Sequence, residues 1–270
     1  MIQPPSAFPL DSGTTKTSPE WYGHEDPKVL AAGHSHSLCL FLALATNITT
    51  VPAAVLRGQG NVVDDLYWDS VLAADPTLPL AISFRGNAAT RRFLFETERP
   101  FTVVHPAVPR TEEYQVIPVE AVRFLMQREA TELAGLLERL AGRQCVLLAP
   151  PPPKSESSIR RGLNLNTPMA SIMRKHGWEP ATAQITRLSL RVALHAITFA
   201  VLEGVAQDHR VPVLPVPSPA VADDGSLRQQ FANADVSHGN TAFGALMWER
   251  VAAHFDLKPA HPARPATGAE

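Results

Sequence analysis

Short apolar runs alternate along this chain with longer stretches in which apolar residues recur at helical spacing. The apolar runs predict five β-strands, at residues 28–33, 51–56, 78–84, 143–149 and 211–216. The other stretches predict helices, at residues 37–45, 63–73, 118–141, 183–208 and 239–255. Strands that alternate with helices are typical of a mostly parallel sheet covered on both faces. We therefore expect an α/β fold, a three-layer α/β/α sandwich around a mostly parallel five-stranded sheet.

The stretch 118–141 has the most regular helical pattern. Pro118 suits the first turn of a helix, where the missing N–H costs nothing. Apolar residues follow at helical spacing: Val119, Val122, Leu125, Met126, Leu133, Leu136, Leu137 and Leu140. The pattern predicts one long amphipathic helix.

The two ends of the chain lack such patterns. Residues 1–26 are rich in Pro, Ser, Thr and Gly and predict an irregular lead-in, and residues 258–270 predict a flexible tail. Residues 27–257 then form a single domain. Inside it, residues 154–180 show no clear period over a length unusual for a loop, which indicates a lid or a binding insertion.

Composition narrows the classes of partner. Hydrophobic residues make up 45% and charged residues 19% of the 270 residues, the balance of an ordinary globular protein. The formal net charge is −2, so no overall basic field attracts nucleic acid. The first residues, Met-Ile-Gln-Pro-Pro-Ser, do not resemble a secretory signal, and the longest apolar run, 38–45, is too short for a membrane span. We expect a cytoplasmic protein.

The two cysteines, Cys39 and Cys145, each lie in an apolar run. Two cysteines in such surroundings do not make a disulfide framework. We expect two buried free thiols.

A serine stands where the first predicted strand turns into the first helix. The segment reads Gly33-His34-Ser35-His36-Ser37. This position holds Ser35 at the carboxyl edge of the sheet, where α/β active sites lie. The backbone N–H of Ser35, at the start of a helix, is also placed to stabilise an oxyanion. Ser35 is therefore the candidate nucleophile, although serine is equally a preferred N-cap residue.

A possible base for this serine lies near the other end of the chain. Asp235 precedes His238 by three residues, just before the last predicted helix. A serine hydroxyl needs a base within hydrogen-bond reach, and the imidazole needs a carboxylate that fixes its tautomer. Asp235 and His238 can supply both, whereas the plainer alternative is a loop histidine that caps the helix.

Two further segments contain possible hydrogen-bond donors for an oxyanion. Asn87 follows Gly86 at the end of the third predicted strand, and its amide is a candidate donor. Gly58 and Gly60 follow the second strand, and Gly60 is the candidate backbone donor. Each of these residues is also an ordinary turn residue.

Together these segments resemble the SGNH/GDSL hydrolase family. The family's blocks appear in order as Gly33-His34-Ser35, Gly58 or Gly60, Gly86-Asn87 and Asp235-x-x-His238. The run 98–101, shortly after the asparagine block, is similar to a poorly characterised bacterial branch of that superfamily.

The resemblance implies a flavodoxin-like fold and ester hydrolysis or acyl transfer through an acyl-enzyme, without metal or organic cofactor. It implies Ser35 as nucleophile, Asp235 and His238 as its base pair, and an oxyanion hole made by Ser35, Gly60 and Asn87. The expected substrate is a small ester or an O-acylated compound such as an acylated glycan. In two places the chain departs from the family: His34 replaces the usual Asp, and Ala88-Ala89 follow Asn87.

Two other functions remain open at this point. An α/β-hydrolase esterase or lipase could use the same serine, although the segment lacks the second glycine of Gly-x-Ser-x-Gly. A non-catalytic or metal-binding protein could use the fold, with His34, His36, His238 and Asp235 as possible ligands. The oligomeric state stays open as well.

Overall fold

A computed structural model of the chain describes residues 19–57, 64–96, 99–106, 108, 113–165, 168–175 and 179–258.

The core is a mostly parallel sheet of six strands, in the order β1-β3-β2-β4-β7-β8. The strands are β1 (Glu20–Gly23), β2 (Val29–Gly33), β3 (Ala53–Arg57), β4 (Leu80–Ser83), β7 (Cys145–Leu148) and β8 (Val213–Leu214). All neighbours pair in parallel except β1, which runs antiparallel to β3. The five parallel strands are the five that the sequence predicts, in the flavodoxin-like order.

The sixth strand, β1, lies in the expected irregular lead-in. Its Trp21 packs against the core, and the ring of Tyr22 meets that of Phe41 with centroids 4.8 Å apart. Aromatic residues favour strands because they pack well on a pleated surface. The expectation of five strands was therefore wrong by one, because these two aromatics stand in a segment whose prolines, serines, threonines and glycines predict irregular structure.

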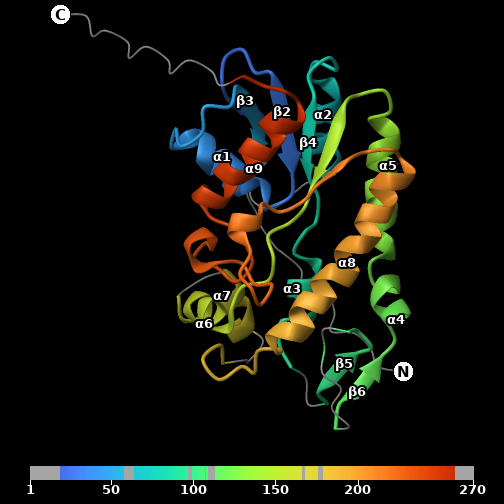
Figure 1. Ribbon diagram of the computed structural model, residues 1–270, viewed down its shortest axis with the longest axis vertical. Helices are drawn as coiled ribbons and strands as arrows, with labels where there is room; N and C mark the ends of the chain where they lie inside the picture. Colours follow the sequence, from blue (N-terminus) through green and yellow to red (C-terminus); the bar gives the residue numbers. More distant parts are fainter. Residues whose placement is uncertain are drawn as a thin grey trace, which may run out of the picture.

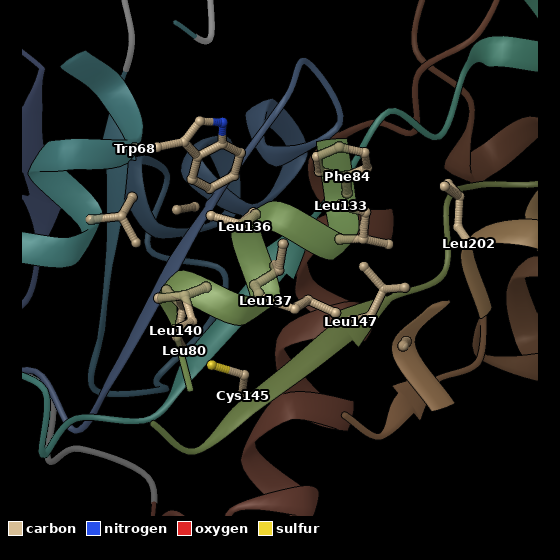
Figure 2. Close-up of a cluster of buried hydrophobic side chains, with 14 of the residues drawn as sticks. Trp68, Leu80, Phe84, Leu133, Leu136, Leu137, Leu140, Cys145, Leu147 and Leu202 are labelled. Atoms are coloured by element: carbon tan, nitrogen blue, oxygen red, sulfur yellow. The ribbon is translucent and has the colours of Figure 1, made fainter. Parts of the chain in front are cut away.

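Helices cover both faces of the sheet (Figure 1). The helices α1 (Ser37–Ala45) and α9 (Thr241–His254) pack on one face, and α2 (Asp65–Ala73), α5 (Gln127–Arg139) and α8 (Leu188–Asp208) on the other. Residues of one strand alternate between the two clusters, as the period of a strand requires. In β2, for example, Leu30 belongs to the α2/α5/α8 side and Ala31 to the α1/α9 side. Figure 2 shows the former cluster, with Trp68 of α2 and leucines of α5 above β4 and β7. The three-layer α/β/α sandwich is confirmed.

The predicted long helix 118–141 is in fact two helices, α4 (Val119–Phe124) and α5 (Gln127–Arg139). The break lies at Leu125 and Met126, where the Met126 N–H donates to the Arg123 carbonyl three residues back. Val122 of α4 is buried in a cluster with the N-terminal half of α8, whereas Met126 is buried in the main core beside the sheet. The apolar stripe thus serves two separate cores, and periodicity alone does not reveal the change of direction between them.

Regular structure also appears where the pattern predicts none. The stretch 154–180 holds α6 (Glu156–Asn164) and α7 (Pro168–Lys175), and Ser155 caps α6 by accepting from Ser158 N–H. After β4 come α3 (Ala88–Phe93), β5 (Phe101–Val103) and β6 (Gln115–Ile117), the last two forming a separate small sheet seen at the lower end of Figure 1. Two 3-10 turns, η1 (Ser218–Ala220) and η2 (Gln229–Phe231), lie between β8 and α9.

The helix α8 starts at Leu188, five residues later than the pattern predicts, because Ile185 pairs with Phe95 in an isolated bridge. Among the described residues α8 alone is long and apolar enough to span a bilayer, and 39% of its most apolar window is buried inside the protein. A helix in the core of a globular protein meets the same criterion. Cys39 and Cys145 are free and buried, as expected, and burial raises the pKa of Cys39 to about 12 and that of Cys145 to about 11.

Candidate active site

The candidate residues lie on loops that follow parallel strands. Ser35 comes after β2, Asn87 after β4, and Asp235 and His238 on the loop between β8 and α9. Because parallel strands end at the same edge of the sheet, these loops converge at the edge where ligands bind in open α/β folds.

The tight turn before Ser35 depends on Gly33. Its φ is +150°, and a Cβ at this position would lie 1.9 Å from the carbonyl oxygen of Ser83 in β4. The backbone of β2 therefore passes against β4 as only glycine allows. The next residue continues this contact, because the His34 N–H donates to the Ser83 carbonyl at 2.8 Å.

Ser35 itself is half-buried, two residues before α1 begins. The N-cap residue of α1 is His36, and no side chain caps this helix. The alternative role of Ser35 as a helix cap therefore does not apply, and its hydroxyl forms no hydrogen bond with the described residues.

Asp235 and His238 form the pair that their spacing predicts. The Nδ1–H of His238 donates to Asp235 Oδ2 at 2.8 Å. The other carboxylate oxygen, Oδ1, accepts from the backbone N–H groups of Ser237 and His238 at 2.8 and 2.7 Å. With Nδ1 engaged in this way, Nε2 of His238 is left as the free ring atom, and it is buried and unpaired in the part of the chain that the structure describes. The cap of α9 is Asn240, so His238 does not serve as a helix cap.

The Asp235 carboxyl stays ionised despite its partial burial. Burial alone raises the pKa of Asp235, but the hydrogen bond and charge of His238, together with the charge of Lys154, outweigh it and hold this pKa well below its usual range. A carboxylate in this state can stabilise the charged form of the imidazole.

The packing of α1 against α9 brings the serine loop to the histidine loop. The backbone of α1 at Cys39 lies so close to Gly244 of α9 that a Cβ there would be 2.0 Å from the Cys39 carbonyl oxygen. The indole N–H of Trp248 donates to the Leu40 carbonyl at 3.0 Å. As a result the ring centroids of His36, next to Ser35, and of His238 lie 4.8 Å apart. No hydrogen bond joins Ser35 and His238 themselves in this structure; such bonds are often long in enzymes without substrate.

His36 is a buried neutral neighbour of His238. It is 6% exposed, and both of its ring nitrogens lack partners among the described residues. Burial, and to a lesser degree the charge of His238, hold the pKa of His36 well below its usual range. His36 therefore remains uncharged beside His238 at neutral pH.

Asn87 occupies the N-cap position of α3 but forms no cap bond, and its side chain is half-buried. The residue two positions earlier, Arg85, has a φ of +36°, and a Cβ on Gly86 would lie 2.1 Å from the Pro150 ring. Strained backbone of this kind is common at functional sites. The turn thus presents an asparagine amide that the helix does not use.

The departure at His34 has a structural counterpart. The backbone N–H of Arg85 donates to His34 Nδ1 at 3.4 Å, so the imidazole accepts a hydrogen bond from the strained turn that carries Asn87. The ring also meets Phe84 edge-on, with centroids 4.9 Å apart. His34 therefore faces the turn after β4, while His36 faces His238. Among the described residues no three His, Cys, Asp or Glu side chains are placed to hold a metal ion.

Two parts of the site differ from the sequence prediction in what can be compared. The candidate donors Gly58 and Gly60 lie outside the described residues. Conversely, the sequence reasoning missed Lys154, whose side chain is fully buried and bonded to Asp235. The available sign was a lysine directly after a buried strand and four prolines, at the sheet edge where open α/β folds bind ligands.

No family model matches the chain, and no curated protein matches it. Among solved structures it is similar to a GDSL-like lipase from Bacteroides thetaiotaomicron, at 10% identity over 86% of this chain and 89% of that one, with a TM-score of 0.46. It is also similar to a lipase/acylhydrolase from Enterococcus faecalis, at 13% identity over 87% of this chain and 100% of that one, with a TM-score of 0.43. A mutant of an acetyl-xylooligosaccharide esterase from Geobacillus is similar at 11% identity over 89% of this chain and 99% of that one, with a TM-score of 0.41. At such identities and TM-scores these likenesses decide nothing about the activity of this chain.

A sheet of flavodoxin-like order carries a serine loop, an uncommitted asparagine and a bonded Asp–His pair at one edge. This is the arrangement that the resemblance to the SGNH/GDSL hydrolases implies.

Proposed function

We propose that this protein is a serine esterase that acts through an acyl-enzyme on a small ester or an O-acylated substrate such as an acylated glycan. The observation that carries the proposal is the Asp235–His238 hydrogen bond of 2.8 Å, which leaves the buried Nε2 of His238 unpaired beside the serine loop. A neutral imidazole whose Nδ1 carries the proton has Nε2 as its basic atom. That atom is the one a serine hydroxyl needs.

In the first half of the reaction, His238 Nε2 takes the proton of Ser35 as the hydroxyl oxygen bonds to the carbonyl carbon of the ester. The tetrahedral intermediate collapses, the bond to the alcohol breaks, and His238 returns the proton to the departing oxygen. In the second half, water attacks the acyl-serine ester with His238 again as base, which releases the acid and restores Ser35. Asp235 holds the tautomer throughout and stabilises the imidazolium. An acceptor hydroxyl in place of water would give acyl transfer by the same steps.

The negative oxygen of the intermediate needs donors. The backbone N–H of Ser35 at the start of α1 and the amide of Asn87 are the donors that we assign, with the Gly60 N–H as a third. His34 supports this group indirectly, because it accepts the Arg85 N–H in the turn before Asn87.

Replacement of Asn87 by alanine is expected to lower kcat by about 10²–10³-fold, the usual effect of one lost oxyanion donor. Because Asn87 forms no cap bond in α3, the thermal stability of the variant should stay close to that of the wild type. Ester turnover with 4-nitrophenyl acetate measures the effect. Asn164→Ala, at the exposed end of α6, is the matched control. Full turnover by Asn87→Ala would remove Asn87 from the oxyanion hole.

The proposed function itself is tested with a fluorophosphonate probe, which phosphonylates only an activated serine. We expect one adduct, located on Ser35 by mass spectrometry, and none in His238→Ala. The matched control is His209→Ala, outside the site at the end of α8, which should label at the wild-type rate. If the folded wild-type chain takes no label, or takes it on another serine, the proposal is wrong.

A further inference from the structure

Lys154 is a buried cation directly attached to the Asp–His loop. Its side chain is fully buried, and its ammonium group donates to the carbonyl oxygens of Asn233 and Asp235 at 2.9 and 2.6 Å. It also lies 3.2 Å from Asp235 Oδ1. All three acceptors belong to residues 233–235, and they match the three donors of an ammonium group.

We propose that Lys154 is a positioning residue that fixes the loop of Asp235 and His238 and places a fixed positive charge on the carboxylate that His238 shares. This inference rests on the proposed function and adds to it a residue that does not touch the substrate.

The backbone of Lys154 is itself held from two sides. The guanidinium of Arg191 in α8 donates to the Lys154 carbonyl at 2.6 Å and to the Thr186 carbonyl at 2.7 Å. On the other side Lys154 forms a β-bridge with Leu227, and the Leu227 N–H donates to the Pro153 carbonyl at 2.9 Å. The preceding prolines restrict the chain further because each fixes its own φ. Lys154 therefore offers a rigid anchor to a loop that lacks regular structure.

The burial of the Lys154 ammonium group depends on its ion pair with Asp235. An ammonium group without water is costly unless it is paired and hydrogen-bonded. Burial lowers the pKa of Lys154, and the charge of Asp235 and its hydrogen bond oppose this change. The carboxylate is thus shared, with Lys154 on Oδ1 and His238 on Oδ2.

This sharing has a definite electrostatic sign. The Lys154 ammonium interacts electrostatically with Asp235 and with His36, and His36 interacts in turn with His238 and with His195 of α8. Arg191 of α8 approaches the Lys154 carbonyl. A fixed positive charge on the carboxylate makes a second positive charge, the imidazolium, less favourable. Loss of the Lys154 charge should therefore make the imidazolium more favourable, so that a reaction that needs the neutral imidazole should require a higher pH.

The test measures the rate of fluorophosphonate labelling of Ser35 against pH for Lys154→Met. We expect the acid limb of this profile, the low-pH range in which labelling falls off, to move to higher pH, so that labelling at a fixed pH on that limb slows about tenfold. Lys154→Arg, which keeps the charge, should return the limb toward its wild-type position. Asn233→Ala is the matched control for charge, because it removes a neutral donor to Asp235 Oδ2 at 3.2 Å and should leave the limb in place.

An unchanged acid limb in a folded Lys154→Met chain overturns the proposal, as does an equal displacement of the limb in Asn233→Ala. Near-UV circular dichroism checks the fold first, and if Lys154→Met does not fold, Lys154→Gln carries the same comparison.

A measurement on the wild-type chain stands apart from the variants and from activity. In ¹⁵N NMR spectra a slowly exchanging ammonium signal is expected for Lys154, and its absence overturns the proposal. This readout does not involve Ser35. A wild-type chain that takes no label but shows this signal would reject the proposed function and leave the anchoring of Asp235 standing.

Discussion

Asp235→Asn is expected to lower kcat for ester hydrolysis by about 10³–10⁴-fold, the loss typical of a catalytic carboxylate replaced by its amide. The asparagine amide can present N–H to His238 Nδ1, which favours the tautomer with its proton on Nε2. That tautomer cannot accept the proton of Ser35. The substitution also removes the negative charge that would stabilise the imidazolium.

The same variant leaves the buried Lys154 ammonium without its counter-ion. Breaking a buried ion pair from one side typically costs about 3–5 kcal/mol of stability, so the free energy of unfolding should be measured beside turnover. Asp223→Asn is the matched control, because Asp223 is exposed and lies 3.5 Å from Arg228. Turnover by folded Asp235→Asn within tenfold of the wild type would contradict the assigned role of this carboxylate.

Gly244→Ala is expected to destabilise the protein by about 2–3 kcal/mol, the usual cost of forcing a group into a packed interface. The added Cβ would lie 2.0 Å from the Cys39 carbonyl oxygen and 3.0 Å from the Leu40 nitrogen, both of them backbone atoms that cannot rotate away. The helices α1 and α9 must therefore move apart. Since α1 follows Ser35 and α9 follows His238, fluorophosphonate labelling should slow together with the loss of stability.

Urea unfolding measures this effect, and Gly204→Ala is the matched control. Gly204 lies in α8, and a Cβ there would meet nothing within 4 Å. Alanine is the better helix former by about 1 kcal/mol, so this control should be neutral or stabilised. Equal free energies of unfolding for the two variants would show that the contact between α1 and α9 does not limit stability.

The sequence predicts most of the sheet and much of the site, for identifiable physical reasons. Buried strands such as β2 and β7 are unbroken apolar runs in the sequence. A serine directly after a strand, or an Asp-x-x-His directly before a helix, is a local motif that the sequence shows. The break between α4 and α5 has no such motif, since Leu125 and Met126 keep the helical period while the two helices pack against different partners.

Lys154 was missed for a different reason. In the sequence it is a single lysine at the start of a stretch in which apolar residues show no regular spacing, and most lysines in proteins are exposed. Only the three-dimensional path of residues 233–235 supplies its three acceptors. Long-range partners of this kind are set by the topology of the chain, which local patterns do not contain.

The antiparallel strand β1 has a consequence for solubility. It pairs with β3 from Glu20–Arg57 to Gly23–Ala54 and so occupies backbone donors and acceptors that an apolar strand would otherwise present at the margin of the sheet. Bare, flat margins of this type recruit strands from other molecules and seed aggregation. The charged Glu20 and the short length of β1 make a poor template in their turn. These four residues thus cover the β3 margin of the sheet, and loss of the β1 pairing would open the backbone of β3 to strands of other molecules.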